Sequence, residues 1–275
     1  MSYPHRAAAG GPGAAAGRAA PSAPSAQALR RRGQAEPAPS ALRARAPMTR
    51  RYDASWLTPS GEIDSSTRIA PAITLFEEAF SALARGAVVQ TDEGPVAIED
   101  IQPGMRALTA DGRVETVTWV GSMVIYPGMT SEAEGEAVTL TRITAEAFGQ
   151  GRPMPDLVLG PRARLCLRDP RLMRVAGVER AFVPARAFLD GVSVIEVTPI
   201  APVTAYHLVL ERQGALRVDG LEVESYHPGE GVEGMIEPRM LSLFLAQFPQ
   251  IERIADFGPM AAPRLTRFEV ESLWD

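Results

Sequence analysis

Short apolar segments separated by turn residues fill the middle of the chain, from about residue 87 to residue 229. Turn sequences recur every eight to ten residues in the first part, at 92–95, 102–104 and 110–112. Asp-Gly pairs between alternating segments are strong hairpin signals, and short strands at this spacing are typical of an all-β domain. The pattern returns in the segments 156–167, 191–197 and 205–226. It therefore predicts a mainly β domain.

The flanks of this β region have a different pattern. Apolar residues at helical spacing between Ala70 and Gly86 predict a helix that Gly86 ends, and residues 51–70 are expected to be a loose lead-in. A second apolar run, Met240–Phe248, predicts a helix after the β region, and the final residues favour one more. Short helical or loop inserts are expected at Ile143–Gly149 and Val183–Gly191.

The first 50 residues are rich in Ala, Pro, Gly, Ser and Arg, and they lack the large apolar side chains that offset ordering entropy. We expect a disordered tail, and Met48 is an alternative start to Met1. The net charge is -5, but residues 1–50 hold eight arginines and one acid, so the remainder carries 28 - 8 = 20 arginines against 33 - 1 = 32 acids, or -12. An acidic body is a poor match for nucleic acid.

The sequence has one cysteine, three histidines and no lysine, which excludes several kinds of catalytic and metal site. All 28 basic residues are arginine, which leaves no lysine for Schiff-base chemistry. One cysteine, Cys166, allows no intrachain disulfide, and three histidines are too few for a usual zinc site, so we expect no metal and no cofactor. The sequence has no run of about 18 apolar residues and no signal-peptide pattern. A cytoplasmic location is the default expectation, and export without a signal peptide stays open.

Four segments of the β region, in order, resemble the Hedgehog/intein (Hint) family in its bacterial form. They are "ARGAVVQTDEGPVAIEDIQPGMRALTADG", "GRPMPDLVLGPRARLCL", "VPARAFLDG" and "AYHLVLERQGALRVDGLEVESYHPG". The resemblance implies a compact β domain with short helices at its N- and C-terminal flanks. It divides the chain into the tail (1–50), a lead-in segment with a helix (51–79), the Hint domain (80–229) and a C-terminal helical extension (230–275). It also implies that the ends of the domain, near Ala82 and Ser225–His227, lie close together.

Active members of the family perform an acyl shift, in which a cysteine or serine attacks the preceding peptide carbonyl and a histidine helps the amide nitrogen to leave. The resemblance places the nucleophile at Ala82. It places the histidine of the second segment (151–167, the middle block) at Ala163, and a further histidine of the fourth segment (205–229, the closing block) at Gln213. None of these side chains can perform its part of the chemistry. The surviving candidates are His207, which matches a histidine of the closing block, and Ser81, one position before the nucleophile.

Two hypotheses follow from these positions. The first is a Hint protein without self-cleavage that serves as a structural or interaction module for a protein partner. The second is an autoprocessing protein with a non-standard nucleophile, such as Ser81 assisted by His207, which predicts a break near residues 79–81. Two other residues receive structural interpretations: Cys166 as a small buried hydrophobe, and His227 as an anchor of the exit loop through a hydrogen bond.

Overall fold

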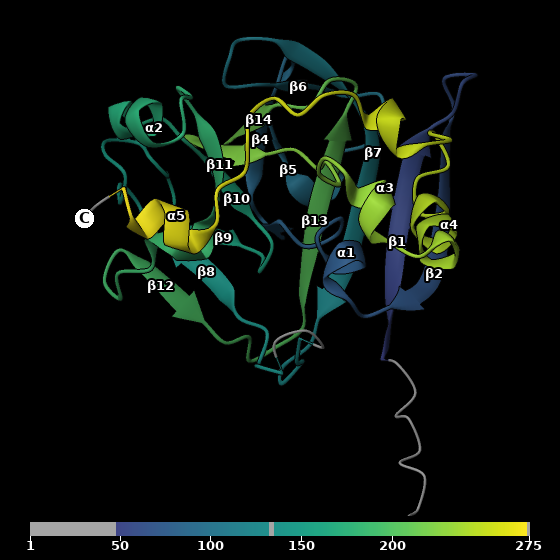
Figure 1. The fold of residues 1–275 in the computed structure, drawn as a ribbon, viewed down its shortest axis with the longest axis horizontal. Coiled ribbons are helices and arrows are strands. Elements are labelled where there is room, and N and C mark those ends of the chain that lie inside the picture. The colour runs from purple at the N-terminus through teal and green to yellow at the C-terminus, as the bar shows by residue number, and fades with distance from the viewer. Residues whose placement is uncertain (1–47, 132–134, 274–275) are drawn as a thin grey trace, which may run out of the picture. The chain divides into compact units, whose positions relative to one another are not determined.

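The computed structural model describes residues 48–131 and 135–273 (Figure 1). Residues 1–47 of the predicted tail lie outside this part of the chain. Thr49 and Arg50, which the sequence pattern places in the tail, instead begin the first strand, β1 (Thr49–Leu57).

Antiparallel strand pairs build almost the whole described fold, as the alternation and turn spacing predict. The continuous path of paired strands runs β11-β10-β15-β14-β4-β6-β7-β13-β3-β9-β8-β12, with β1, β2 and β5 attached at its side. The bounds are β2 (Ile63–Pro71), β3 (Leu83–Ala84), β4 (Val88–Thr91), β5 (Gly94–Ala97), β6 (Arg106–Leu108), β7 (Val114–Ile125), β8 (Leu140–Ile143), β9 (Leu157–Leu159), β10 (Arg164–Leu167), β11 (Ala181–Pro184), β12 (Val194–Val197), β13 (Val203–Leu210), β14 (Ala215–Val218) and β15 (Leu221–Glu224).

An Asp-Gly pair forms the turn between β14 and β15. Asp219 and Gly220 are the two loop residues, with φ of 46° and 83°, between the paired residues Val218 and Leu221. Two successive positive φ values suit the right-handed twist of a hairpin, and Asp and Gly tolerate them best. The Asp219 carboxylate also accepts the Val88 N–H at 3.0 Å, which ties the turn to β4.

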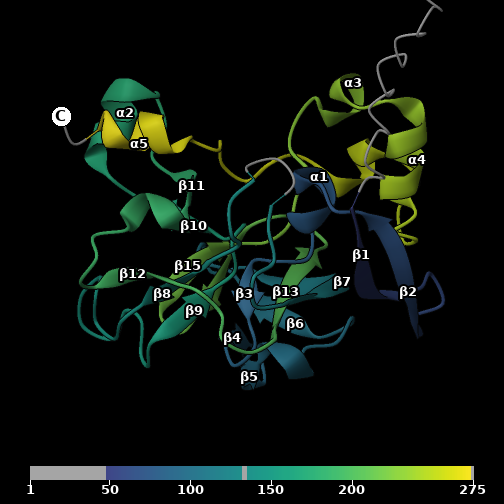
Figure 2. The ribbon, with the colours of Figure 1, turned by 90° about the horizontal axis from the view of Figure 1, so that it is seen from below.

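The segment 51–70, expected to be a loose lead-in, forms the hairpin of β1 and β2. Strand β1 alternates in burial, with Tyr52, Ala54 and Trp56 turned inward, and it pairs with β7 as well as β2. The hairpin thus extends the sheet on the side where α4 (Pro238–Leu245) lies (Figures 1 and 2).

The predicted long helix between Ala70 and Gly86 is largely wrong. Only one helical turn forms, α1 (Thr74–Glu77), and the chain is extended again at β3. Leu83 pairs with Tyr206 on β13 and with Leu159 on β9, so sheet pairing outweighs the local helical spacing. The remaining helices and 3-10 turns are α2 (Pro170–Val175), α3 (Val232–Met235), α5 (Arg267–Glu271), η1 (Ile98–Asp100), η2 (Ala185–Phe188) and η3 (Ile254–Phe257).

An aromatic core joins the sheet to the C-terminal segment. Trp119 on β7 packs against Phe80 and Phe248 with ring centroids 5.1 and 4.6 Å apart, and its indole N–H donates to the Gln247 carbonyl at 2.8 Å. Full burial of such side chains contributes about 1.5–3 kcal/mol each. The predicted helix at 240–248 is therefore confirmed as α4 and its final turn, packed on its own domain. No helix in the described ranges has the length and apolar character needed to cross a membrane.

Candidate functional site

The peptide bond between Ser81 and Ala82 is buried and bonded on both sides. Both residues have no exposed surface. The Ser81 carbonyl accepts the N–H of Arg162 at 3.2 Å, and the Ala82 N–H donates to the Tyr206 carbonyl at 3.0 Å. The Ser81 hydroxyl donates to the Glu77 carbonyl at 2.6 Å. This peptide therefore lies between β13 and the loop before β10, with each of its polar groups satisfied.

Gly160 lets the neighbouring loop approach this peptide closely. A Cβ atom built on Gly160 would lie 2.1 Å from the Ser81 carbonyl oxygen and 2.7 Å from its carbon. No side chain fits at such a distance, so only glycine allows this contact. The Gly160 N–H also donates to the Ala82 carbonyl at 2.7 Å, which adds to the bonds that hold the two segments together.

Ala163 lies between two arginines that both reach back to the end of α1. Arg162 lies 3.7 Å from the Glu77 carboxylate, and Arg164 donates to the Glu78 carboxylate at 2.8 Å. The Arg162 and Arg164 side chains lie toward the end of α1, whereas the Ala163 side chain belongs to the apolar core. The Ala163 side chain is buried, and its methyl group can neither donate nor accept a hydrogen bond.

His207 on β13 touches both ends of the predicted domain. Its Nδ1 lies 2.7 Å from the Glu78 carbonyl and its Nε2 lies 3.2 Å from the Glu224 carbonyl. The predicted closeness of the segments near Ala82 and Ser225 is therefore confirmed. Burial lowers the pKa of His207 to about 4, because the interior disfavours the imidazolium and Arg264 and Arg164 add to this effect. His207 is accordingly neutral at pH 7, so its ring carries one N–H and donates to one of these two carbonyls. Neither ring nitrogen is bonded to Ser81.

Gln213 is bonded within the closing segment and to the C-terminal segment. Its amide NH₂ donates to the Glu224 carboxylate at 2.9 Å and to the Ser225 carbonyl at 3.3 Å. Its carbonyl oxygen accepts the Ala261 N–H at 2.6 Å. The structure thus brings Gln213 and His207 to the same glutamate, Glu224, through its carboxylate and its carbonyl respectively.

The C-terminal segment enters this site through Arg264. The segment between η3 and α5 runs past β14 and β11 (Figure 1), and Phe182 on β11 bonds to Pro263 and Leu265 on either side of Arg264. The Arg264 guanidinium donates to both oxygens of Glu224, at 2.9 and 3.2 Å, and to the His227 carbonyl at 2.6 Å. The segment 258–266 therefore forms a strap across the closing block, residues 205–229, and Arg264 holds it there.

Two glutamates and two arginines form the buried charge network of the site. Arg164 lies between Glu78 and Glu224, at 2.8 and 3.7 Å. Burial is the largest single influence on Glu78 and opposes its ionisation, but the charge and hydrogen bond of Arg164 together with the charges of Arg264 and Arg162 outweigh it, so the pKa is lowered. Burial raises the pKa of Glu224 above its ordinary value, although Arg264 and Arg164 act in the opposite direction. No local sequence pattern predicts these ion pairs, because their members are far apart along the chain.

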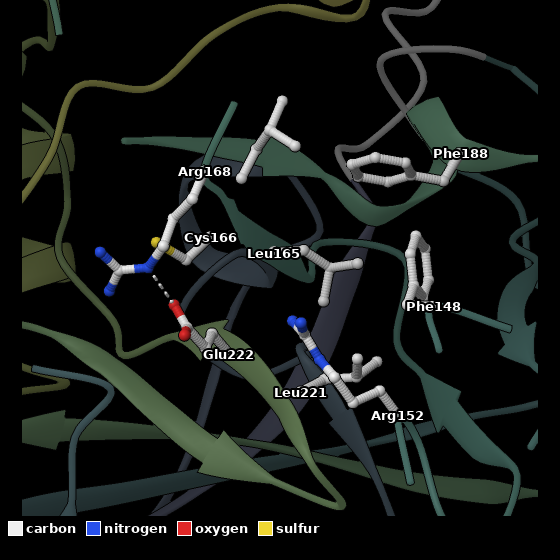
Figure 3. A pocket seen from close by; sticks show the side chains of 9 residues that line it. Phe148, Arg152, Leu165, Cys166, Arg168, Phe188, Leu221 and Glu222 are labelled. Carbon is white, nitrogen blue, oxygen red and sulfur yellow. Dashed lines mark hydrogen bonds and ion pairs between the residues drawn. The ribbon is translucent and has the colours of Figure 1, made fainter. Parts of the chain in front are cut away.

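Cys166 and His227 lie away from the Ser81–Ala82 peptide bond. Cys166 lies beside a cavity of about 170 Å³, near the ion pair of Arg168 with Glu222 and the ring pair of Phe148 with Phe188 (Figure 3). Burial raises the pKa of its thiol to about 11, so it stays protonated at neutral pH. The prediction for His227 is confirmed: its Nδ1 accepts the Gly229 N–H at 3.0 Å and its Nε2 lies 2.9 Å from the Gly258 carbonyl.

The described residues contain no group of three or more His, Cys, Asp or Glu side chains that could hold a metal ion. The residues brought together are those of one buried junction: Ser81, Ala82, Ala163, His207 and Gln213, joined through Glu78, Arg164, Glu224 and Arg264. Chemically, this arrangement holds segments together through hydrogen bonds and ion pairs.

Comparison with known proteins gives a family and several distant structural likenesses. The sequence profile described as Hint domain matches residues 81–230. The bacterial intein-like domain from Clostridium thermocellum is 14% identical with a TM-score of 0.37, covering 54% of this chain and 99% of that one. The MchDnaB-1 intein is 15% identical with a TM-score of 0.32, covering 53% and 100%. No curated protein matches the chain. Because the profile spans more than half of the 275 residues, the chain belongs to the Hint domain family.

Proposed function

We propose that this protein is a Hint domain that does not cleave itself and serves as a structural or interaction module. The observation that carries the proposal is that the Ser81–Ala82 peptide bond has no nucleophile beside it and is held in place. The residue that follows the carbonyl has only a methyl group, and the peptide is buried and bonded on both sides. An acyl shift needs a nucleophile within reach of that carbonyl and an acid for the leaving nitrogen.

The alternative of an active site built from Ser81 and His207 gains no support from their contacts. The Ser81 hydroxyl donates to Glu77, and both ring nitrogens of His207 face backbone carbonyls. A general base must lie within hydrogen-bond reach of the proton that it removes. The low pKa of His207 also weakens it as a base at neutral pH.

The charge network supports a scaffolding role for the same positions. Arg162 and Arg164 attach α1 to the β10 side, and Arg264 attaches the C-terminal segment to Glu224. Segments that a cleavage reaction would need to release are joined here by buried ion pairs. Breaking such a pair by removing one partner costs about 3–5 kcal/mol.

The proposal is tested by the mass of the purified chain. The full chain, its Ser81→Ala variant and its His207→Gln variant are produced side by side and weighed by mass spectrometry. We expect one full-length species in each case, since no residue of the junction is positioned to attack. A break near residues 79–81 that the wild-type chain shows and Ser81→Ala lacks would establish the autoprocessing alternative.

A further inference from the structure

Strand β2 has one edge that no strand of the described residues covers. It pairs with β1 along its whole length, from Ile63 to Pro71, and with no other strand in that part of the chain. It is the outermost strand beside β1 in both views of the fold (Figures 1 and 2). An open edge presents a row of unpaired backbone N–H and C=O groups, so it is a template for pairing with a further strand.

The hydrogen bonds at the two ends of the β1–β2 pair show which backbone groups face this edge. The Ala72 N–H donates to the Met48 carbonyl, and the Thr58 N–H donates to the Glu62 carbonyl, both at 2.8 Å. Because successive residues of a strand direct these groups to opposite sides, the even-numbered residues of β2 face β1. The open edge therefore carries the N–H and C=O groups of the odd-numbered residues before Pro71, which are Ile63, Ser65, Thr67 and Ile69.

The side chains of β2 are complementary to a second copy of the same strand. The strand is symmetric in character about Ser66: isoleucines stand three residues to either side and hydroxyl residues one to either side. Asp64 and Arg68, which carry opposite charges, stand two residues to either side. In an antiparallel pair of two copies centred on Ser66, Asp64 of each copy lies opposite Arg68 of the other, and Ile63 lies opposite Ile69. Cross-strand pairs of opposite charge and of apolar side chains stabilise a sheet.

The same register suits the backbone. It sets the outward-facing residues opposite one another, so that each such pair can exchange two N–H···O=C bonds. Asp64 and Arg68 then form a non-hydrogen-bonded pair, the kind in which Cα atoms lie about 4.5 Å apart and side chains come closest. A shift by one residue would set outward-facing groups against inward-facing ones and would separate the charges.

These side chains are largely unoccupied within one chain. Ile63 and Ile69 are 50% and 75% exposed. Arg68 is exposed and makes no ion pair with a residue that the structure describes. The Asp64 carboxylate accepts the N–H of the adjacent Ser65 at 2.8 Å. Pairing would exchange this local bond for a charged partner, free the Ser65 N–H to join the ladder, and cover both isoleucines.

We propose that β2 pairs with β2 of a second copy, antiparallel and centred on Ser66, so that one sheet runs through a symmetric dimer. A two-fold dimer, in which one surface meets itself, is the commonest form of assembly. A contact made by one strand of each copy is expected to bury less than the standard interface of about 1,200–2,000 Å², so the dissociation constant should be on the order of 10–100 µM. The inference goes beyond the proposed function and does not depend on it, because it involves no residue of the buried junction.

Charge reversal tests the pairing. The full chain is followed by sedimentation velocity from about 1 to about 200 µM in 150 mM salt, where charges are screened beyond about 8 Å, and should change from monomer to dimer. Asp64→Arg and Arg68→Asp each set like charges opposite one another, so each should weaken dimerisation at least tenfold. An equimolar mixture of these two variants should associate again, because each supplies the charge that the other lacks. The matched control Arg217→Asp, which reverses an exposed arginine on β14, should dimerise as the wild type does.

A disulfide test reports the register. Ser66 lies opposite itself in the proposed pair, within the Cα separation of about 4.4–6.8 Å that a disulfide requires. In a Cys166→Ser background, Ser66→Cys should therefore form a covalent dimer under oxidised glutathione. Ser60→Cys, an exposed position in the turn between β1 and β2, is the matched control and should cross-link at least tenfold more slowly.

A wild-type chain that stays monomeric at 200 µM would overturn the inference. So would a mixture of Asp64→Arg and Arg68→Asp that associates no better than either variant alone, or equal cross-linking of Ser66→Cys and Ser60→Cys. Slow hydrogen exchange of the amides of residues 63–69 in the dilute monomer would show that the chain's own residues 1–47 cover the edge, and would also overturn it. A monomer of full mass refutes only this inference, whereas a chain that breaks near residue 81 refutes the proposed function.

Discussion

Replacing Arg264 by glutamine tests whether the C-terminal segment is attached to the body through Glu224. The Glu224 side chain is 1% exposed and accepts from Arg264 at 2.9 and 3.2 Å. Removing one partner of a buried pair costs about 3–5 kcal/mol. Gln213 at 2.9 Å and Arg164 at 3.7 Å remain beside Glu224, so we expect a loss nearer to about 2–3 kcal/mol. For a body of this size that lowers the melting temperature by roughly 5–10 °C.

The stability that Arg264→Gln loses should depend on pH, and the sign of this dependence follows from the pKa of Glu224. Burial already raises the pKa of Glu224, and without Arg264 the pKa rises further, because less positive charge opposes desolvation. A carboxyl group whose pKa is higher in the folded than in the unfolded chain binds protons on folding, so its contribution to stability grows as pH falls. The difference in unfolding free energy between wild type and Arg264→Gln should therefore be largest near pH 8 and shrink toward pH 5.

Urea and thermal unfolding, followed by circular dichroism at both pH values, measure this difference. Arg267→Gln is the matched control, because Arg267 is an exposed arginine nearby in the chain whose ion pair is with Glu271, one helical turn away. It should cost less than about 0.5 kcal/mol. Arg264→Lys, which keeps the charge but not the fork, should be intermediate. Equal losses in Arg264→Gln and Arg267→Gln, or a loss that grows toward pH 5, would refute the reasoning.

Three further predictions concern the junction itself. Gly160→Ala should destabilise the fold by about 3 kcal/mol in urea unfolding, because the added Cβ would lie 2.1 Å from the Ser81 carbonyl oxygen. Gly234→Ala is the control, because a Cβ there would have no neighbouring atom within 4 Å, and equal stability of the two variants would contradict the close approach. An NMR titration of His207 should give a pKa of about 4 and a neutral ring at pH 7, and a value above 6 would contradict its burial. The triple variant Ala82→Cys, Ala163→His and Gln213→His should cleave before residue 82 only slowly, over hours with thiol, because a misplacement of about 1 Å lowers the rate roughly 100-fold. Each single variant should show no cleavage. Cleavage by Ala82→Cys alone would contradict the need for the two histidines.

The β segments and their turns were predictable because alternation and Asp-Gly pairs are local signals. Asp219 and Gly220 adopt the positive φ values that such a turn requires. The β1–β2 hairpin had a usable signal as well, since Tyr52, Ala54 and Trp56 alternate before a turn that contains Gly61. The helix predicted from Ala70 fails because Leu83 pairs across two strands, which no local pattern reveals.

The candidate site was predictable only where it follows the family pattern. The correspondence of Ala82, Ala163 and Gln213 with family positions came from that resemblance and stays a prediction. The strap was not predictable, because Arg264 and Glu224 are 40 residues apart and one arginine among 28 carries no local mark of its partner. Likewise, no local pattern identifies Glu77 and Glu78 as the partners of Arg162 and Arg164.

The most direct test of the central claim is a nucleophile challenge of the intact chain. The purified protein is incubated overnight at pH 7 with dithiothreitol or hydroxylamine, either of which attacks the ester or thioester that an acyl shift forms, and its mass is followed. The account predicts a single species at the full-length mass of 29.5 kDa throughout, because Ala82 has no group that can form such a bond. Fragments that divide the chain between residues 78 and 82, and that Ser81→Ala abolishes, would contradict it.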